Sequence, residues 1–132
     1  MSESFVEILT EWDIVEARQL GRNEAKRIGF GAVDQARITT AISELARNIY
    51  LYADKGRILI ETIDMSGTKG IKIVAQDEGP GIEDIRLVMQ DGYSTSQGLG
   101  AGLPGVRRLM DEFDIQTTVN EGTIVRIIKW LR

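Results

Sequence analysis

The sequence predicts an α+β fold, a two-layer sandwich with helices on one face of a mixed, mainly antiparallel sheet. Residues 32–53 place apolar side chains at helical spacing and contain no Gly or Pro, which predicts a long helix. Residues 57–63 and 70–76 alternate in the manner of two hairpin strands. A second pair of strands is expected at 114–119 and 123–131. Because strands joined by short turns pair antiparallel, an all-parallel sheet is disfavoured.

The composition excludes several kinds of chemistry. The 132 residues fit one domain over 1–132, and they include neither Cys nor His, which rules out thiolate nucleophiles, disulfides and imidazole metal sites. The net charge of −4 offers no basic surface for nucleic acid. No apolar run approaches the roughly 18 residues of a membrane span, and the first residues are acidic where a signal peptide is basic. We therefore expect a cytoplasmic protein with a protein or small-molecule partner, and no nucleic-acid or membrane partner.

The remaining elements are predicted from local signals. Residues 4–12 alternate roughly between apolar and polar side chains and predict a first strand. Asp13, with Glu16 three positions later, has the pattern of an N-cap and capping box, so a helix is expected over 14–28. Further along the chain, a short helix is expected over 83–91.

A Gly- and Ser-rich piece at 92–102 interrupts all periodicity. Helical spacing then resumes, and Pro104 suits the first turn of this last helix. The apolar positions of the last helix are Leu103, Val106, Leu109, Met110 and Phe113.

On the long helix expected over 32–53, Glu44 and Asn48 are one turn apart and project from one face, on the flank of the apolar stripe. Most such pairs are solvated i,i+4 contacts. A carboxylate beside a carboxamide also suits Mg²⁺-assisted phosphoryl transfer, in which the amide oxygen binds the metal and the carboxylate orients or deprotonates a hydroxyl. The pair is therefore a candidate for the rim of a pocket over the sheet.

Asp77 directly follows an expected strand, and Gly79 and Gly81 come at alternate positions after it. An Asp at a strand end is also a common turn residue. Here the carboxylate is able to accept a hydrogen bond from an adenine amino group, while the glycines make room for a flat ring. Two glycines around Pro80 favour this second interpretation.

The Gly-rich segment 98–105 precedes the last helix, so that its free N–H groups and the helix dipole are able to bind phosphate. A flexible linker is the alternative, since residues 93–97 before it are polar. Gly100-x-Gly102-x-x-Gly105 also matches the dinucleotide fingerprint, but it does not directly follow the first strand of a βαβ unit. The sequence contains neither a P-loop nor the signatures of ordinary protein kinases. The three motifs together predict an ATP pocket of another type.

These motifs, in their order along the chain, resemble the N box, the two glycine boxes and the final Gly-Thr element of the GHKL ATP-binding superfamily. The matching residues are Glu44, Asn48, Asp77, Gly79, Gly81, the cluster 98–102, and Glu121-Gly122-Thr123. Within that superfamily, segments 39–53 and 98–113 closely resemble the small serine/threonine switch kinases of the bacterial stressosome.

The resemblance implies a role for each residue. Glu44 is expected to be the catalytic base and Asn48 to coordinate Mg²⁺, while Asp77 selects the adenine of ATP and residues 92–102 form a lid. The nucleotide-binding residues it implies are Asn48, Asp77, Gly79, Gly81, Ile82, Ser94, Thr95, Gly98, Leu99, Gly100, Ala101, Gly102, Leu103 and Thr123. The chain departs from most relatives at Ile49, where they have Ala, and we expect this to change packing rather than metal binding.

The resemblance also implies partners. Switch kinases of this kind are described as phosphorylating Ser or Thr on STAS-domain scaffold proteins, and then binding and activating a PPM-type phosphatase. The alternative from another class is a nucleotide-gated anti-sigma factor in which phosphorylation is secondary. The catalytic domain of a histidine kinase is disfavoured, because the sequence contains no His and no dimerisation helices. A domain with chance glycines does not explain three boxes in the correct order.

Overall fold

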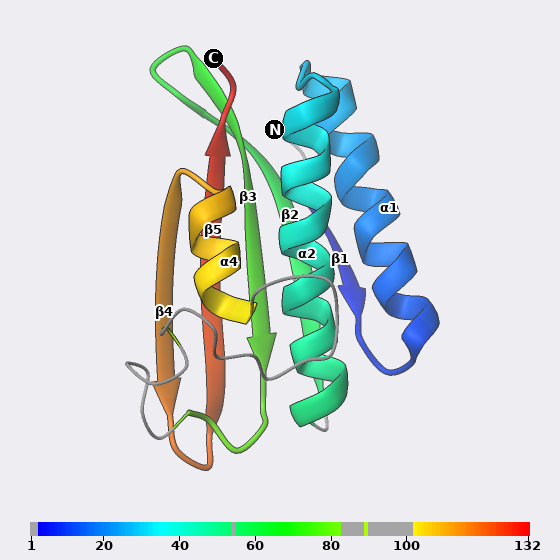
Figure 1. Cartoon of the computed structure of the whole chain (residues 1–132), viewed down its shortest axis with the longest axis vertical. Helices are drawn as coiled ribbons and strands as arrows, with labels where there is room; N and C mark the ends of the chain where they lie inside the picture. Colours follow the sequence, from blue (N-terminus) through cyan, green and yellow to red (C-terminus); the bar gives the residue numbers. More distant parts are fainter. Residues whose placement is uncertain (1–2, 54, 83–88, 90–101) are drawn as a thin grey trace.

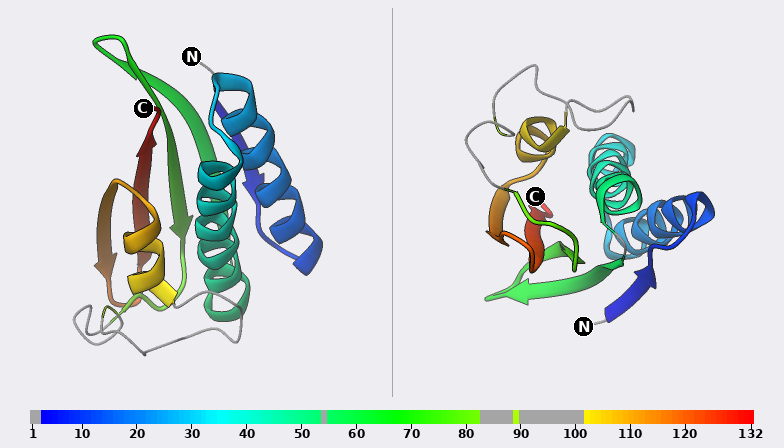
Figure 2. Two further views of the ribbon diagram at one scale, coloured as in Figure 1. Left: turned by 45° about the horizontal axis from the view of Figure 1, so that its top comes forward. Right: turned by 90° about the horizontal axis from the view of Figure 1, so that it is seen from below.

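The computed structural model describes residues 3–53, 55–82, 89 and 102–132. Its strands form one sheet in the order β1-β2-β3-β5-β4, and helices α1, α2 and α4 lie on one face of it (Figures 1 and 2). The elements are β1 Glu3–Glu7, α1 Glu11–Ile28, α2 Ala32–Tyr52, β2 Gly56–Met65, β3 Thr68–Asp77, α4 Gly102–Leu109, β4 Glu112–Thr118 and β5 Gly122–Trp130. The expected α+β sandwich is confirmed, and every described strand pairing is antiparallel.

Helix α1 begins earlier than the sequence suggested. Its N-cap is Thr10, and Asp13 lies in the first turn, where the carboxylate Oδ2 accepts the backbone N–H groups of Leu9 and Thr10, both at 2.8 Å. These two hydrogen bonds fix the start of the helix directly after Thr10, which is still extended with φ −132° and ψ 167°. The first strand therefore ends at Glu7, and the predictions of Asp13 as N-cap and of Glu16 as its capping partner are wrong.

Helix α2 supplies the centre of the core. The apolar stripe read from the sequence is buried, and it packs on the inward side chains of β2 and β3. A Cβ at Gly21 of α1 would collide with Ile42 of α2, so the glycine lets the two helices approach closely. The buried residues of the stripe are Ile38, Ala41, Ile42, Leu45 and Ile49. Among the described helices, none is long and apolar enough to cross a lipid bilayer.

The hairpin strands β2 and β3 are longer than expected, because the turn between them is tight. Ser66 and Gly67 have positive φ values of 56° and 90°, and the strands stay paired up to Met65 and Thr68. A two-residue turn with positive φ at both positions matches the twist of antiparallel strands. The turn between the two strands is therefore limited to residues 66 and 67.

Helix α4 ends at Leu109, and Phe113, which was expected on the helix, lies on β4. The backbone N–H of Asp111 donates to the carbonyl oxygen of Ile128 at 2.9 Å, so the chain pairs with β5 directly after the helix. The helix expected over 83–91 falls almost wholly outside the described residues.

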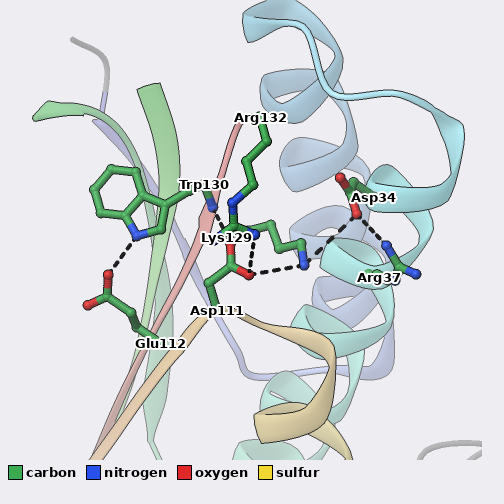
Figure 3. A network of polar contacts seen from close by, with 7 residues as sticks. All are labelled: Asp34, Arg37, Asp111, Glu112, Lys129, Trp130 and Arg132. Carbon is green, nitrogen blue, oxygen red and sulfur yellow. Dashed lines mark hydrogen bonds and ion pairs between the residues drawn. The ribbon is translucent and has the colours of Figure 1, made fainter. Parts of the chain in front are cut away.

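A polar network joins the C-terminal end of β5 to the turn after α4 and to α2 (Figure 3). Asp111 Oδ2 accepts the backbone N–H of Trp130 at 2.7 Å, and Oδ1 lies 3.4 Å from Lys129 Nζ and 3.2 Å from Arg132 Nη1. Lys129 Nζ is also 3.9 Å from Asp34 Oδ1. Burial pushes the pKa of Asp111 up, but the Trp130 N–H and the two cations outweigh it, and the pKa lies below its usual range. The ionised carboxylate therefore stabilises the C-terminal strand.

Candidate functional site

Segments far apart in the sequence meet at one end of the sheet, the lower end in Figure 1. Helix α2 and strand β3 end here, β2 and α4 begin here, and the chain turns from β4 into β5. At the end of β3, Asp77 is paired with Gly56 of β2 and with Thr123 of β5. The fold thus brings the predicted residues Asp77 and Thr123 side by side, although they belong to different motifs.

Asp77 is held by backbone groups of two segments. Its Oδ1 accepts the N–H of Gly79 at 2.9 Å and that of Thr123 at 3.3 Å. Within the part of the chain that the structure describes, Oδ2 forms no hydrogen bond. Burial raises the pKa of this carboxyl, and the two N–H groups oppose that shift. The second oxygen is therefore fixed in orientation and available to a ligand that donates a hydrogen bond.

The two glycines after Asp77 lie against other backbone segments. A Cβ at Gly79 would be 3.0 Å from the Cα of Ala53, directly after α2. Gly81 has a φ of 78°, and a Cβ there would be 2.6 Å from the carbonyl oxygen of Thr118 at the end of β4. Both positions are closed to larger side chains, so the segment follows a path that only glycine permits.

Thr117 was not predicted at the site, yet it ties the glycine segment to the last two strands. Its Oγ1 accepts the N–H of Ile82 at 2.9 Å and lies 2.9 Å from Thr123 Oγ1. Gly122, with a φ of 130°, passes so close to the carbonyl oxygen of Asp77 that a Cβ would collide with it. Thr117 pairs with Thr123 in the register. The position of Thr117 opposite Thr123 could have been predicted from the sequence by pairing the two expected C-terminal strands around Gly122.

Glu44 is buried within α2, whereas the sequence placed it on the flank of the apolar stripe at a pocket rim. The residue is 2% exposed, and its Oε1 lies 3.5 Å from Arg47 Nη1. Asn48, one turn later, is half-buried. Electrostatic interactions are stronger away from bulk water, so a carboxylate at this position would interact strongly with a hydroxyl group brought within hydrogen-bonding distance.

Ile49, the position at which the resemblance implies Ala, lies in the core beside Gly56. Ile49 is buried, and its Cγ2 lies 2.5 Å from where a Cβ would stand on Gly56. The same Cβ would be 3.1 Å from the Cβ of Asp77. Gly56 therefore leaves room both for Ile49 and for the site carboxylate, and it is a second supporting residue that sequence reasoning missed.

The second glycine motif is described only at its end. Gly102, with a φ of 70°, begins α4, and Leu103 is buried directly after it. Helix α4 packs on α2, so its first turn is held near the other motifs. The remaining predicted nucleotide-binding residues lie outside the described part: Ser94, Thr95, Gly98, Leu99, Gly100 and Ala101.

The donor set available to a metal is small. Across the described residues, no group of three or more acidic, Cys or His side chains is close enough to hold an ion. Asn48 offers one neutral carboxamide oxygen. Such a ligand fits Mg²⁺, which usually keeps several waters and takes further oxygens from substrate phosphates.

Comparison with known proteins shows which protein family the chain belongs to. Residues 9–129 match the family model of the histidine kinase-like ATPase domain, and the chain belongs to this family of ATP-binding domains. It is similar to the serine/threonine-protein kinase RsbT of Bacillus subtilis (strain 168), with 70% identity over 130 residues that cover 98% of each chain. Identity at this level over nearly the whole of both chains makes the protein an ATP-dependent protein-serine/threonine kinase.

Other relatives carry different names. The anti-sigma F factor of Thermoanaerobacter sp. (strain X514) is 38% identical over 101 residues, which cover 73% of this chain and 70% of that protein. Among solved structures, the RsbU and RsbW domains of a Mycobacterium tuberculosis protein match all of this chain and 34% of theirs, with a TM-score of 0.68 and 15% identity. The catalytic domain of histidine kinase ThkA matches with a TM-score of 0.53 and 19% identity, over 96% of this chain and 95% of its own. At such identities the two structures show the fold alone.

Proposed function

We propose that residues 1–132 act as one kinase domain that uses Mg·ATP to phosphorylate Ser or Thr on STAS-domain scaffold proteins. We further propose that the protein then binds and activates a PPM-type phosphatase in general stress signalling. The observation that carries the proposal is the Asp77 carboxylate, with one oxygen bonded to two backbone segments and the other without a partner among the described residues. The extended similarity to RsbT supports it.

In this proposal Asp77 selects adenine. Its Oδ2 accepts a hydrogen bond from the exocyclic amino group, because Oδ1 is already engaged. Gly79 and Gly81 let the chain after Asp77 pass close to Ala53 and Thr118, and Thr117 ties Ile82 to Thr123 beside the pocket. Buried hydrogen-bonding groups of this kind discriminate strongly, since a base without the amino group leaves the carboxylate unpaired.

The phosphates are assigned to the second glycine motif and to the start of α4. N–H groups at a helix N-terminus and in a Gly-rich segment bind phosphate oxygens. The residues assigned to this role are Ser94, Thr95, Gly98, Leu99, Gly100, Ala101, Gly102 and Leu103. Asn48 is assigned as the protein ligand of Mg²⁺, and the metal, when bound, offsets the negative charge of the phosphates.

Glu44 is assigned as the general base. The oxygen of the substrate Ser or Thr forms a bond to the γ-phosphorus, the bond from that phosphorus to the β–γ bridging oxygen breaks, and the hydroxyl proton passes to the Glu44 carboxylate. Arg47, 3.5 Å from Oε1, orients the carboxylate. The burial of Glu44 supports this role, because a carboxylate removed from bulk water interacts more strongly with a nearby hydroxyl.

A nucleotide-gated anti-sigma factor is the second candidate, and the 38% identity to an anti-sigma F factor favours it. Such a protein holds a sigma factor of RNA polymerase when it is loaded with nucleotide. The proposed kinase has no affinity for a sigma factor. Pull-down of purified sigma factors in the presence of Mg·ATP separates the two functions.

The proposal is tested by transfer of labelled γ-phosphate from Mg·ATP to a purified STAS-domain protein. Acid-stable label on Ser or Thr, lost in Asp77→Asn and in Glu44→Gln, is the expected result. Acid-labile label indicates phosphohistidine and contradicts the proposal. ATP binding without any transfer also contradicts it and favours the anti-sigma function.

A further inference from the structure

Two threonine hydroxyl groups meet beside the Asp77 carboxylate. In the strand register, Thr123 of β5 lies opposite Asp77 of β3 on one side and opposite Thr117 of β4 on the other. Residues that lie opposite each other on antiparallel strands project to the same face of the sheet. For these three residues it is the face that the helices cover, because the buried Ala75 and Val125, two positions from Asp77 and Thr123, share it. The two hydroxyls therefore lie at the same end of the site as Asp77.

The Thr117 hydroxyl has three hydrogen-bonding partners. Its Oγ1 accepts the backbone N–H of Ile82 at 2.9 Å, and it lies 3.2 Å from the carbonyl oxygen of Gly122 and 2.9 Å from Thr123 Oγ1. Thr123 is buried, and its Oγ1 has no other hydrogen-bonding partner among the described residues. The orientation of the Thr123 hydroxyl therefore depends on Thr117.

The number of hydrogens fixes the direction of these bonds. A hydroxyl group donates one hydrogen and accepts at two lone pairs, whereas a carbonyl oxygen only accepts. The Thr117 hydrogen therefore goes to Gly122, and one Thr117 lone pair is taken by the Ile82 N–H. The contact with Thr123 is then a hydrogen bond only if Thr123 donates its own hydrogen to Thr117. This arrangement, which alone satisfies all three contacts, turns the Thr123 hydrogen toward β4 and away from Asp77.

We propose that Thr117 is a positioning residue that sets the base specificity of the site through Thr123. Because Thr117 receives the Thr123 hydrogen, Thr123 Oγ1 presents only lone pairs to a ligand, as Asp77 Oδ2 does. Among these side chains the ligand meets two acceptors and no donor. They suit the exocyclic amino group of adenine, which carries two hydrogens, and oppose a base with a carbonyl oxygen in that place. The inference deepens the proposed kinase function and rests on it.

Removal of the Thr117 hydroxyl has a definite consequence for selectivity. With no acceptor at position 117, the Thr123 hydrogen is free to turn toward Asp77 Oδ2 or toward a bound base. In the first orientation it competes with the adenine amino group for the carboxylate, and in the second it donates to a carbonyl oxygen. Both raise the relative affinity for inosine triphosphate, whose base has a carbonyl oxygen in place of the amino group. A loss of packing alone weakens the binding of both nucleotides alike.

The test is the ratio of the Kd values for inosine triphosphate and ATP, measured by calorimetry on the full chain with Mg²⁺. Thr117→Val keeps the shape of the side chain and removes the hydroxyl. We expect the ratio to fall on the order of tenfold in this variant, which corresponds to about one hydrogen bond gained or lost. Thr117→Ser, which keeps a hydroxyl at the same position, should retain the ratio of the parent chain.

Thr68→Val is the matched control for the loss of a hydroxyl. Thr68 is exposed at the start of β3, at the other end of the strand from Asp77, so the same chemical change there leaves both Kd values unchanged. A parent preference for ATP that Thr117→Val leaves unchanged, or that Thr117→Ser loses equally, overturns the inference and leaves the proposed function standing. Equal affinities in the parent chain contradict adenine recognition by Asp77, and the inference falls with it.

A second measurement locates the hydroxyl hydrogens without any substitution, so it decides the inference even if Thr117→Val does not fold. Neutron diffraction from deuterium-exchanged crystals of the parent chain shows where each hydroxyl deuterium lies. We expect the Thr123 deuterium to point to Thr117 Oγ1, and the Thr117 deuterium to point to the carbonyl oxygen of Gly122. A Thr117 deuterium directed at Thr123 Oγ1 overturns the inference.

Discussion

The Oδ1 atom of Asp77 accepts the backbone N–H of Thr123 at 3.3 Å, although the two residues are 46 positions apart. Gly79 donates to the same oxygen at 2.9 Å. Because one carboxylate oxygen is engaged from two segments, the folded chain sets the direction of the other before any ligand arrives. A preorganised acceptor of this kind gives selectivity without the cost of ordering a side chain on binding.

Replacement of Asp77 by Asn should separate stability from nucleotide binding. The pKa of Asp77 is raised, so its ionised form is disfavoured in the folded state and stability falls as the pH rises through that pKa. At neutral pH, Asp77→Asn should therefore be at least as stable as the parent chain, and the difference should narrow at acid pH. Thermal unfolding of both proteins from pH 3 to pH 7 measures this. A variant that is clearly less stable at pH 7 contradicts the account.

Replacement of Glu44 by Gln should separate catalysis from binding. If Glu44 is the general base, phosphate transfer should fall by about 10² to 10⁴, while the affinity for Mg·ATP is retained. Single-turnover transfer and titration with a fluorescent nucleotide measure the two quantities. Glu16→Gln, an exposed acid on α1, is the control and should leave both unchanged. Full transfer activity in Glu44→Gln would remove Glu44 from the mechanism.

Substitution by Ala should destabilise the protein more at Gly122 than at Gly67, another glycine with a positive φ. Gly67 has a φ of 90° and open space around it, so Gly67→Ala should cost about 1 kcal/mol through backbone strain alone. Gly122→Ala adds a collision with the carbonyl oxygen of Asp77 and should cost at least about 1 kcal/mol more. It should also weaken ATP binding, which Gly67→Ala should not. Urea unfolding and nucleotide titration check both effects, and equal losses in the two variants would contradict the close approach.

The charge of Asp111 should stabilise the fold at neutral pH. The pKa of Asp111 is lowered in the folded protein. The stability that the ionised carboxylate contributes is therefore present above its unfolded pKa of about 3.9 and is lost as the pH falls through its folded pKa. Asp111→Asn keeps an acceptor for the Trp130 N–H but loses the charge, and it should cost about 1 kcal/mol at pH 7. This loss of stability should shrink as the pH falls below the unfolded pKa.

Asp114 gives the matched control for Asp111. Its side chain is 60% exposed, and it lies 3.5 Å from Arg126, so Asp114→Asn should change stability by less than about 0.5 kcal/mol at any pH. Chemical unfolding at pH 7 and pH 3 compares the two variants. A loss in Asp111→Asn that is as large at pH 3 as at pH 7 would show that the hydrogen-bond geometry, and not the charge of Asp111, sets its contribution to stability.

Much of the fold could be predicted from sequence, because the signals are local. The long helix α2 and the β2–β3 hairpin follow from the spacing of apolar residues, and both were found within a few positions. The start of α1 was missed, because Asp13 fits two capping positions and only the folded backbone shows that Thr10 is the N-cap. The end of α4 was missed, because its stop depends on the pairing of Asp111 with Ile128, a contact between distant residues.

The candidate site was predictable where a motif supplies both residue type and position, as at Asp77 and Gly79. It was not predictable where the residue acts through tertiary contacts. In the sequence, Thr117 is an ordinary polar residue of an expected strand, and only the strand register shows that it lies opposite Thr123. Gly56 belongs to no recognisable motif. It leaves room for Ile49 and Asp77, and this role is visible only when those two side chains are placed beside it.

The central claim is that Asp77 recognises the amino group of adenine, and the most direct test is a comparison of ATP with inosine triphosphate, in which a carbonyl oxygen replaces that group. Kd values for both nucleotides are measured by calorimetry with the parent chain and with Asp77→Asn. The account predicts that the parent chain binds ATP at least about a hundredfold more tightly, and that Asp77→Asn, whose amide is able to donate to the carbonyl oxygen, greatly reduces this preference. Equal affinities in the parent chain, or a preference that the substitution leaves unchanged, would contradict the claim.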